Sequence, residues 1–227
     1  MTRQSDSMAQ LPLSARFREQ SRQVHREAAE SRFLAALTDG SLDLAGYAAL
    51  VTQHAAIYRG IEQLADSFAG HPVAGVFVFP ELYRTPALTA DLKFLHGTGA
   101  KHESLTPATE RYVARLAELT DWPGGFVAHH YVRYLGDLSG GQAIGRSVAQ
   151  QYGLTNGGDG LRFYDFDKVA SPKLFKDRYR ELLNEADWDE ADQTRILGEI
   201  DLAFRFNLEL LIDLADEVLP RYPKVAS

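Results

Sequence analysis

Residues 129–146 read HHYVRYLGDLSGGQAIGR, and this stretch decides how the chain folds. Apolar and aromatic residues recur in it at steps of three and four, which is the period of an amphipathic α-helix. The same stretch carries glycines in its interior, at Gly136, Gly140 and Gly141. A glycine inside a helix costs roughly 0.5–1 kcal/mol relative to alanine, so three of them indicate a structural or functional requirement.

Two requirements would explain the glycines: a kink in the helix, or the close approach of a flat ligand to bare backbone. Helical spacing places five residues on one side of the helix, namely Arg133, Gly136, Asp137, Gly140 and Ile144. That side offers backbone without side chains beside one carboxylate and one guanidinium. The pattern therefore predicts a kinked helix over a planar ligand, with a small polar network next to it.

A glycine seam packed against a neighbouring helix is the structural alternative, and it is the commoner explanation of a single GxxxG pattern in a soluble protein. Two features favour a ligand here. The glycines at 140 and 141 are consecutive, and Asp137 lies within the seam, where a buried carboxylate requires a partner. Both interpretations stay open at this point.

The segment YLGDLSGGQ, preceded by HHYVR, closely resembles the distal helix of the haem oxygenases. Two further segments are similar to this family: VHREAAE at residues 24–30 resembles its proximal segment, and AAIYRGIEQL at residues 55–64 resembles its second long helix. The resemblance extends over about residues 13–218. It implies an enzyme that uses O2 to cleave haem to biliverdin, carbon monoxide and ferrous iron.

By this resemblance His25 is the axial ligand of the haem iron, and an imidazole nitrogen is a common ligand of haem iron. Haem b is then both substrate and prosthetic group, and its iron is the metal of the site. The family commonly has an acidic residue four positions after this histidine, where this chain has Ala29. Glu30 follows directly, and the sequence leaves open which group orients the imidazole. A lone histidine is more often an ordinary half-buried side chain.

The resemblance also implies the residues that control oxygen. Asp137 matches an aspartate that holds a chain of ordered water through which protons reach the oxygen, and Arg133 matches a residue that braces this network. Tyr58 matches a tyrosine close to the same water, although a core tyrosine is the equal alternative. His129 and His130 lie seven and six residues before Gly136, roughly 9–10 Å along a helix, so they are poor candidates for a distal acid.

The expected pocket wall consists of bare backbone and one aromatic ring. Gly136 and Gly140, with Gly141 beside them, would let the macrocycle lie against the helix and would direct the oxygen towards one meso edge. Phe204, in the last long helix, matches an aromatic residue of the family's pocket wall.

The two haem propionates require cations or hydroxyl donors, and the resemblance assigns this role to Arg18, Tyr131, Lys176 and Arg180. Arg18 lies seven residues before His25, which is about 10.5 Å along the same helical face. Lys176 and Arg180 are four residues apart and share a helical face. Taken alone, such a pair is more often part of a solvated surface.

Composition limits the class of protein. The chain has 227 residues, which is enough for one domain with a sizeable core. A net charge of -7 argues against general nucleic-acid binding, and the lack of cysteine excludes disulfides and thiolate-bound metals. We expect residues 1–10 to be a disordered lead, residues 11–220 to form a single haem oxygenase-like domain, and residues 221–227 to be a tail.

The hydrophobic periods predict an all-α, multi-helical bundle around one core, with haem held between a proximal helix and the kinked distal helix. Breaker residues set the expected bounds of the helices, which are 14–39, 44–68, 87–95, 107–121, 126–152, 172–185 and 189–219. Residues 71–86 predict a loop with short helical turns, and a buried strand over residues 73–79 is the alternative there.

No run approaches the roughly 18 consecutive apolar residues of a membrane-spanning helix. Several haem oxygenases carry a C-terminal membrane anchor, whereas this chain ends at Ser227 without one, so we expect a cytoplasmic enzyme of the bacterial type. The sequence has no GxGxxG nucleotide-binding fingerprint. We therefore expect the electrons to come from an external donor, a ferredoxin or a flavoprotein reductase.

Two other functions stay open on the sequence alone. A haem carrier or sensor would share His25 and the basic residues, but it would not need Asp137 or the glycine wall. A helical di-iron protein would also be an α-bundle, but it expects two ExxH motifs, and the sequence contains none.

Overall fold

The computed structural model describes residues 11–20, 30–99 and 104–222. These residues form helices and loops without a strand, which confirms the predicted all-α fold. Residues 13–20 are helical. The α-helices that follow are α3 (Arg32–Thr38), α4 (Leu44–Ser67), α5 (Thr85–Gly97), α6 (Pro107–Ala117), α7 (Pro123–His130), α8 (Gln142–Tyr152), α9 (Pro172–Glu185) and α10 (Glu190–Val218). Short 3-10 turns are η1 (Ala74–Phe77), η2 (Pro80–Leu82), η5 (Arg162–Tyr164) and η6 (Leu219–Arg221).

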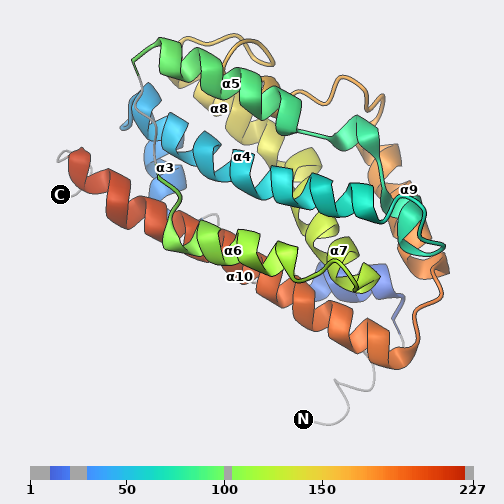
Figure 1. Ribbon diagram of the computed structural model, residues 1–227. Helices are drawn as coiled ribbons and strands as arrows, with labels where there is room; N and C mark the ends of the chain where they lie inside the picture. Colours follow the sequence, from blue (N-terminus) through green and yellow to red (C-terminus); the bar gives the residue numbers. More distant parts are fainter. Residues whose placement is uncertain (1–10, 21–29, 100–103, 223–227) are drawn as a thin grey trace.

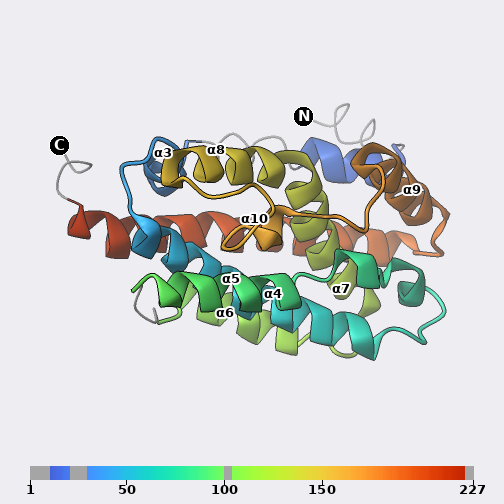
Figure 2. The same ribbon diagram turned by 90° about the horizontal axis from the view of Figure 1, so that it is seen from above.

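The long helix α10 runs along one edge of the molecule in the view of Figure 1. Figure 2 shows α3, α8 and α9 on one side of α10, and α4, α5 and α6 on the other side. Helix α4 packs against α5 and α6, and α10 packs against α6, α7 and α3. Large aromatic side chains fill the space between the helices, among them the fully buried rings of Tyr47, Tyr58, Tyr112, Tyr134 and Tyr179.

Several helices begin at the residues that the sequence predicts. The Thr106 hydroxyl accepts a hydrogen bond from the Thr109 backbone N–H at 3.3 Å, and Pro107 is the first residue of α6. Pro172 opens α9 in the same way, after Ser171. Proline suits this position because the first helical N–H groups have no partner within the helix. Residues 71–86 contain the short turns η1 and η2, and the alternative strand does not form there.

The single helix predicted over residues 14–39 is wrong. The structure describes helix over residues 13–20, and a new helix, α3, begins at Arg32. Ser31 has a non-helical backbone conformation, with φ -59° and ψ 123°, and its hydroxyl accepts a hydrogen bond from the Leu34 N–H at 3.4 Å. Serine is a favoured N-cap because its side chain satisfies a free N–H group, and this local preference overrides the helical period.

The predicted distal helix is present as a continuous helical run from Pro123 to Tyr152. Its middle is π-helical in two segments, η3 (Tyr131–Leu135) and η4 (Asp137–Gly141), which flank Gly136. A π-helical turn interrupts the regular hydrogen-bond ladder of an α-helix, and such segments accompany bends and functional sites. Figure 2 shows the chain changing direction between α7 and α8, as the glycines predict.

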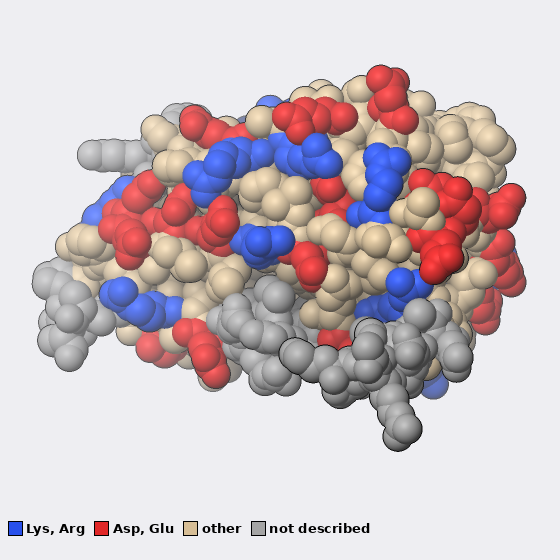
Figure 3. Space-filling view, turned by 90° about the horizontal axis from the view of Figure 1, so that it is seen from below, with Lys and Arg blue, Asp and Glu red and all other residues tan. Residues whose placement is uncertain are grey.

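The charged groups on the surface and the apolar character of the helices are relevant to partners such as other proteins and membranes. Figure 3 shows one face of the molecule, on which basic groups lie interspersed with acidic ones. No helix within the described residues combines the length and the apolar character that crossing a membrane requires.

Candidate active site

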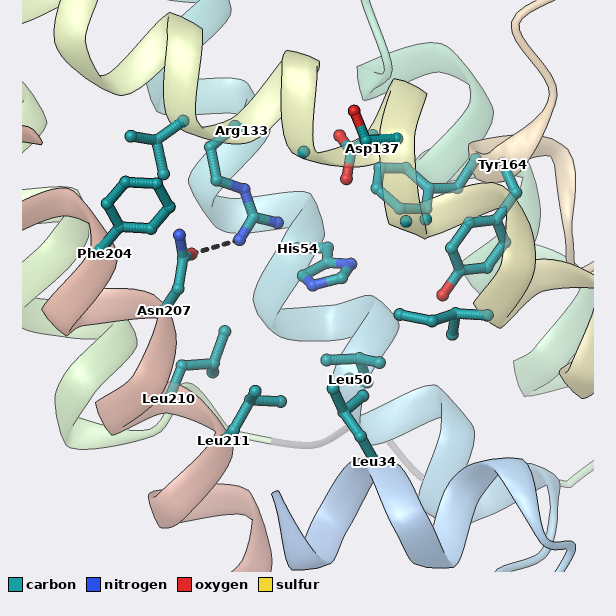
Figure 4. A pocket seen from close by; sticks show the side chains of 17 residues that line it. Leu34, Leu50, His54, Arg133, Asp137, Tyr164, Phe204, Asn207, Leu210 and Leu211 are labelled. Atoms are coloured by element: carbon teal, nitrogen blue, oxygen red, sulfur yellow. Dashed lines mark hydrogen bonds between the residues drawn. The ribbon is translucent and has the colours of Figure 1, made fainter. Parts of the chain in front are cut away.

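A cavity of about 540 Å³ lies between the distal helix, α3, α4, η5 and α10 (Figure 4). This volume lies within the range of roughly 300–1,000 Å³ that is typical of small-molecule sites. Most of the wall is apolar and includes Leu34, Leu50, Val132, Ile144, Phe163, Phe204, Leu210 and Leu211. The polar side chains that line it are His54, Arg133, Asp137, Ser139, Tyr164 and Asn207. An apolar cavity with a few convergent polar groups is the usual form of an active site.

The glycines of the distal helix differ in what surrounds them. A Cβ atom added at Gly136 or Gly140 would have no atom of another element within 4 Å among the described residues. A Cβ atom at Gly145, one turn after Gly141, would lie 2.7 Å from the Tyr164 ring. Gly145 therefore allows close packing, whereas Gly136 and Gly140 present bare backbone to the cavity. This difference favours a ligand over a packed glycine seam at these two positions.

The carboxylate of Asp137 accepts a hydrogen bond from the Tyr58 hydroxyl. Arg133 Nε donates to the same Tyr58 oxygen at 3.3 Å, and the guanidinium lies 4.8 Å from the centre of the Tyr58 ring. Arg133 also donates a hydrogen bond to the side-chain oxygen of Asn207 on α10. The structure thus brings Tyr58, Arg133 and Asp137 together from α4, η3 and η4.

The electrostatics of this group follow from its burial. Burial raises the pKa of the Asp137 carboxyl to about 6, although the Arg133 guanidinium acts in the opposite direction. Burial also raises the pKa of Tyr58 well above its ordinary value, so the phenol stays protonated and donates to the carboxylate. A carboxyl group with a pKa near neutrality can take up and release protons under physiological conditions. The arrangement can therefore pass protons into the cavity.

Several lining residues were not assigned to the site from the sequence. His54 and Asn207 contribute polar atoms, and Phe163 and Tyr164 close the cavity from the loop after α8. His54 lies one helical turn before Tyr58, so spacing along α4 was an available signal for it. The loop residues follow no hydrophobic period, and no comparable signal marks them.

Tyr131, one of the predicted propionate contacts, lies outside the lining of the cavity. Its ring packs edge-to-face against Phe17, with 5.0 Å between the ring centres. Burial raises the pKa of the Tyr131 hydroxyl, and the charges of Arg180 and Arg18 lower it. Both guanidinium groups therefore lie near this hydroxyl.

The two cations of α9 also lie outside the lining. Lys176 Nζ donates to the Ser139 hydroxyl at 3.0 Å and to the Leu138 carbonyl at 3.4 Å, which joins α9 to the π-helical segment η4. Arg180 Nη1 donates to the Asp177 carboxylate at 2.8 Å. The predicted basic residues thus gather around η3 and η4, on α9 and on the helix over residues 13–20.

The remaining predicted site residues differ in whether they line the cavity. Phe204 lines the cavity from α10, and Gly141 lines it with its added Cβ atom 3.4 Å from that of Asp137. His25 and Ala29 lie outside the described residues, and Glu30 is exposed. Among the described residues, no group of three or more His, Asp or Glu side chains is placed to hold a metal ion, so the di-iron alternative finds no ligand set there.

Known proteins are similar to this chain over most of its length. The family model described as "Heme oxygenase" matches residues 11–213. Heme oxygenase 1 of Homo sapiens is 35% identical over 216 residues, which cover 94% of this chain and 75% of that protein. Heme oxygenase 1 of Nostoc sp. is 32% identical over 209 residues, which cover 91% of this chain and 87% of that protein.

The fold agrees with these sequence matches. The crystal structure of heme oxygenase-1 from the cyanobacterium Synechocystis sp. in complex with heme has a TM-score of 0.86 to this chain. The two sequences are 30% identical, and the match covers 95% of this chain and 98% of that one. Sequence, fold and cavity agree, and the chain belongs to the haem oxygenase family.

Proposed function

We propose that this protein cleaves haem to biliverdin, carbon monoxide and ferrous iron, with O2 as co-substrate and with electrons from a separate reductase. As a haem oxygenase, the protein is an oxygen-dependent oxidoreductase that degrades haem. Haem is its substrate and prosthetic group and brings the iron. The observation that carries the proposed mechanism is the cavity itself, in which bare backbone lies beside the hydrogen-bonded group of Tyr58, Arg133 and Asp137.

The glycine wall supports a role in placing the substrate. Because Gly136 and Gly140 present no side chain to the cavity, a flat macrocycle can lie against the helix backbone there. The wall then limits which meso edge the oxygen can reach, while the reactivity resides in the haem itself.

Asp137 supports a role in delivering protons. Its pKa of about 6 allows the carboxyl group to exchange protons with ordered water at neutral pH. The Tyr58 hydroxyl donates to the carboxylate, and the Arg133 guanidinium donates in turn to that hydroxyl. A haem carrier or sensor would need neither the carboxylate nor the bare wall.

His25 is proposed as the residue whose imidazole would bind the haem iron, a role that rests on the resemblance of VHREAAE to the proximal segment. Arg18, Tyr131, Lys176 and Arg180 are proposed to bind the propionates, and their placement around η3 and η4 supports this. An external donor, a ferredoxin or a flavoprotein reductase, is proposed because the chain carries no nucleotide-binding fingerprint.

The test is a turnover experiment in solution. Purified protein is mixed with haem, O2 and an electron donor, and the optical spectrum is followed together with the release of carbon monoxide. We expect the Soret band to disappear while biliverdin absorbance and carbon monoxide appear in equal amounts. A Soret band that persists without biliverdin would favour the carrier or sensor instead.

A further inference from the structure

His54 is a polar side chain of the cavity that the mechanism proposed above does not use. His54 projects from α4, four residues before Tyr58, so both side chains lie on the same face of that helix. In Figure 4 the His54 ring lies in the middle of the cavity, with Arg133 and Asp137 on one side and Leu50 on the other.

Two aromatic rings hold the His54 ring in place. The ring contacts Phe163, with 5.1 Å between centres, and Tyr58, with 6.1 Å between centres. Within the described part of the chain, no group forms a hydrogen bond with either ring nitrogen. His54 is half-buried and lines the cavity, where its imidazole offers a hydrogen-bond donor and an acceptor that a leucine side chain would lack. The imidazole therefore indicates a hydrogen-bonding partner inside the cavity.

The charge state of the ring limits its role. Burial lowers the pKa of His54 well below its ordinary value, and the nearby Arg133 guanidinium lowers it further. The other polar groups that line the cavity are the Asp137 carboxyl, the Ser139 and Tyr164 hydroxyls and the Asn207 amide. The imidazole is neutral in this setting, with one nitrogen that donates a hydrogen bond and one that accepts. It is suited to hold water, which needs two to four polar partners, and unsuited to act as an acid.

We propose that His54 is a further positioning residue, whose imidazole binds a water molecule in the cavity and thereby links α4 to the Asp137 carboxyl. The ring stays neutral throughout, and no proton is transferred to or from it. Its effect on catalysis is indirect, because it fixes the water through which Asp137 exchanges protons. This inference rests on the proposed function, but the hydrogen bond itself does not require turnover.

The first test uses the protein without haem. The chain has seven histidines, and 15N-labelled imidazole resonances report the tautomer of each, with His54→Gln identifying the signal that is lost. We expect His54 to be neutral and predominantly in one tautomer, and its signal to shift in Asp137→Asn. His130 serves as the control, because its Nδ1 lies 3.0 Å from the Tyr179 hydroxyl and the ring does not line the cavity. The proposal would be overturned if the His54 signal showed mixed tautomers and kept the same chemical shift in Asp137→Asn.

The second test measures turnover and haem affinity. His54→Leu should lower the rate of biliverdin formation about three- to tenfold while haem affinity stays within about twofold, because one positioning hydrogen bond is lost. His54→Gln should recover at least half of the rate, since its amide can hold water. Thr52→Val is the matched control, because that hydroxyl bonds to the Ala48 carbonyl within α4, at 2.9 Å.

The outcomes of the second test separate the two proposals. A His54→Leu variant at the parent rate, or a His54→Gln variant as slow as His54→Leu, would overturn the role of His54. A parent protein that does not convert haem would contradict the proposed function instead, and the resonance experiment would then still decide whether His54 and Asp137 are linked.

Discussion

Asp137 shows how the cavity determines the chemistry of a single residue. A carboxyl group in water is ionised at neutral pH, but burial beside the distal helix raises the pKa of Asp137 to about 6. Arg133 opposes this shift, and Tyr58 donates a hydrogen bond to the ionised form. The balance leaves a group that changes its protonation state near neutrality, which is what a proton relay requires.

The first prediction, at the scale of single residues, concerns His25. Replacing it by alanine should remove the proposed axial nitrogen, so the optical spectrum of the haem complex should change and biliverdin formation should fall by at least tenfold. Added imidazole should restore part of the spectrum and of the rate, because it can occupy the position of the lost side chain. A His25→Ala complex with the spectrum of the parent would show that another group binds the iron.

Replacing Gly140 and Gly145 by alanine, one at a time, tests whether the bare backbone at Gly140 serves haem binding. A Cβ atom at Gly140 meets no atom of another element within 4 Å among the residues that the structure describes, so Gly140→Ala should leave the haem-free protein equally stable or more stable by roughly 0.5–1 kcal/mol. It should nevertheless weaken haem binding or alter the ratio of biliverdin isomers. Gly145→Ala should cost about 1–3 kcal/mol of stability, because the new Cβ atom lies 2.7 Å from the Tyr164 ring. A Gly140→Ala protein with parental haem binding and isomer ratio would contradict the role of the bare wall.

The sequence predicts the cavity wall that the distal helix forms better than the wall that α10 forms. Arg133, Gly136, Asp137, Gly140 and Ile144 all line it, because helical spacing alone places them on one face. Asn207 meets Arg133 across 74 positions of sequence, and such a contact depends on how helices pack. No period within one helix encodes that packing.

At the scale of elements, the two π-helical segments of the distal helix decide where the cavity lies. Their wider turns flank Gly136 and bend the chain between α7 and α8, and the glycines on that stretch face the cavity. Sequence analysis predicts this bend because repeated glycines are unfavourable in a straight helix. It misses the break before α3, where Ser31 caps a new helix, because the apolar period continues across the break.

Helix α9 leads to a third prediction. Lys176 bonds to Ser139 and Leu138 on η4, and Arg180 lies near the Tyr131 hydroxyl. Replacing Lys176 and Arg180 together by alanine should weaken haem binding or let the macrocycle rotate, which changes the ratio of biliverdin isomers. Arg178→Ala is the control on the same helix, because this exposed side chain pairs with Glu181. If the double variant keeps the affinity and the isomer ratio of the parent, the two cations belong to the solvated surface.

At the scale of the whole molecule, one buried ionic group joins three helices. Glu199 on α10 accepts hydrogen bonds from Arg115 Nε at 2.9 Å and Arg115 Nη2 at 2.8 Å, and His129 Nε2 lies 2.8 Å from the same carboxylate. The other His129 nitrogen lies 3.1 Å from the Tyr112 hydroxyl. His129 is therefore a core residue of this group, in keeping with its exclusion as a distal acid.

The ionic group gives the fourth prediction, a dependence of stability on pH. Burial by itself raises the pKa of Glu199, but the hydrogen bonds from His129 and Arg115 outweigh it and lower the pKa to about 2. Because the folded-state pKa lies below the unfolded value of about 4.5, the stabilisation is present above that pH and is lost as the pH falls towards 2. It should amount to roughly 2–3 kcal/mol.

Urea unfolding between pH 3 and pH 6 measures this effect. The difference in unfolding free energy between the parent and Glu199→Gln should shrink as the pH falls, because protonation removes the same charge in the parent. Glu209→Gln, an exposed partner of Arg111, is the control and should show little dependence. A Glu199→Gln difference that stays constant over this range would contradict the assignment.

The most direct test of the account is a single turnover of haem by Asp137→Ala beside the parent. If Asp137 only braced the helix, the variant would lose roughly 1–3 kcal/mol of stability and keep its activity per folded molecule. As the anchor of proton-carrying water, Asp137 should instead be needed after haem and oxygen have bound. We predict a folded variant that binds haem and forms biliverdin about 10²–10⁴-fold more slowly. A folded Asp137→Ala protein that makes biliverdin at the parent rate would contradict the account.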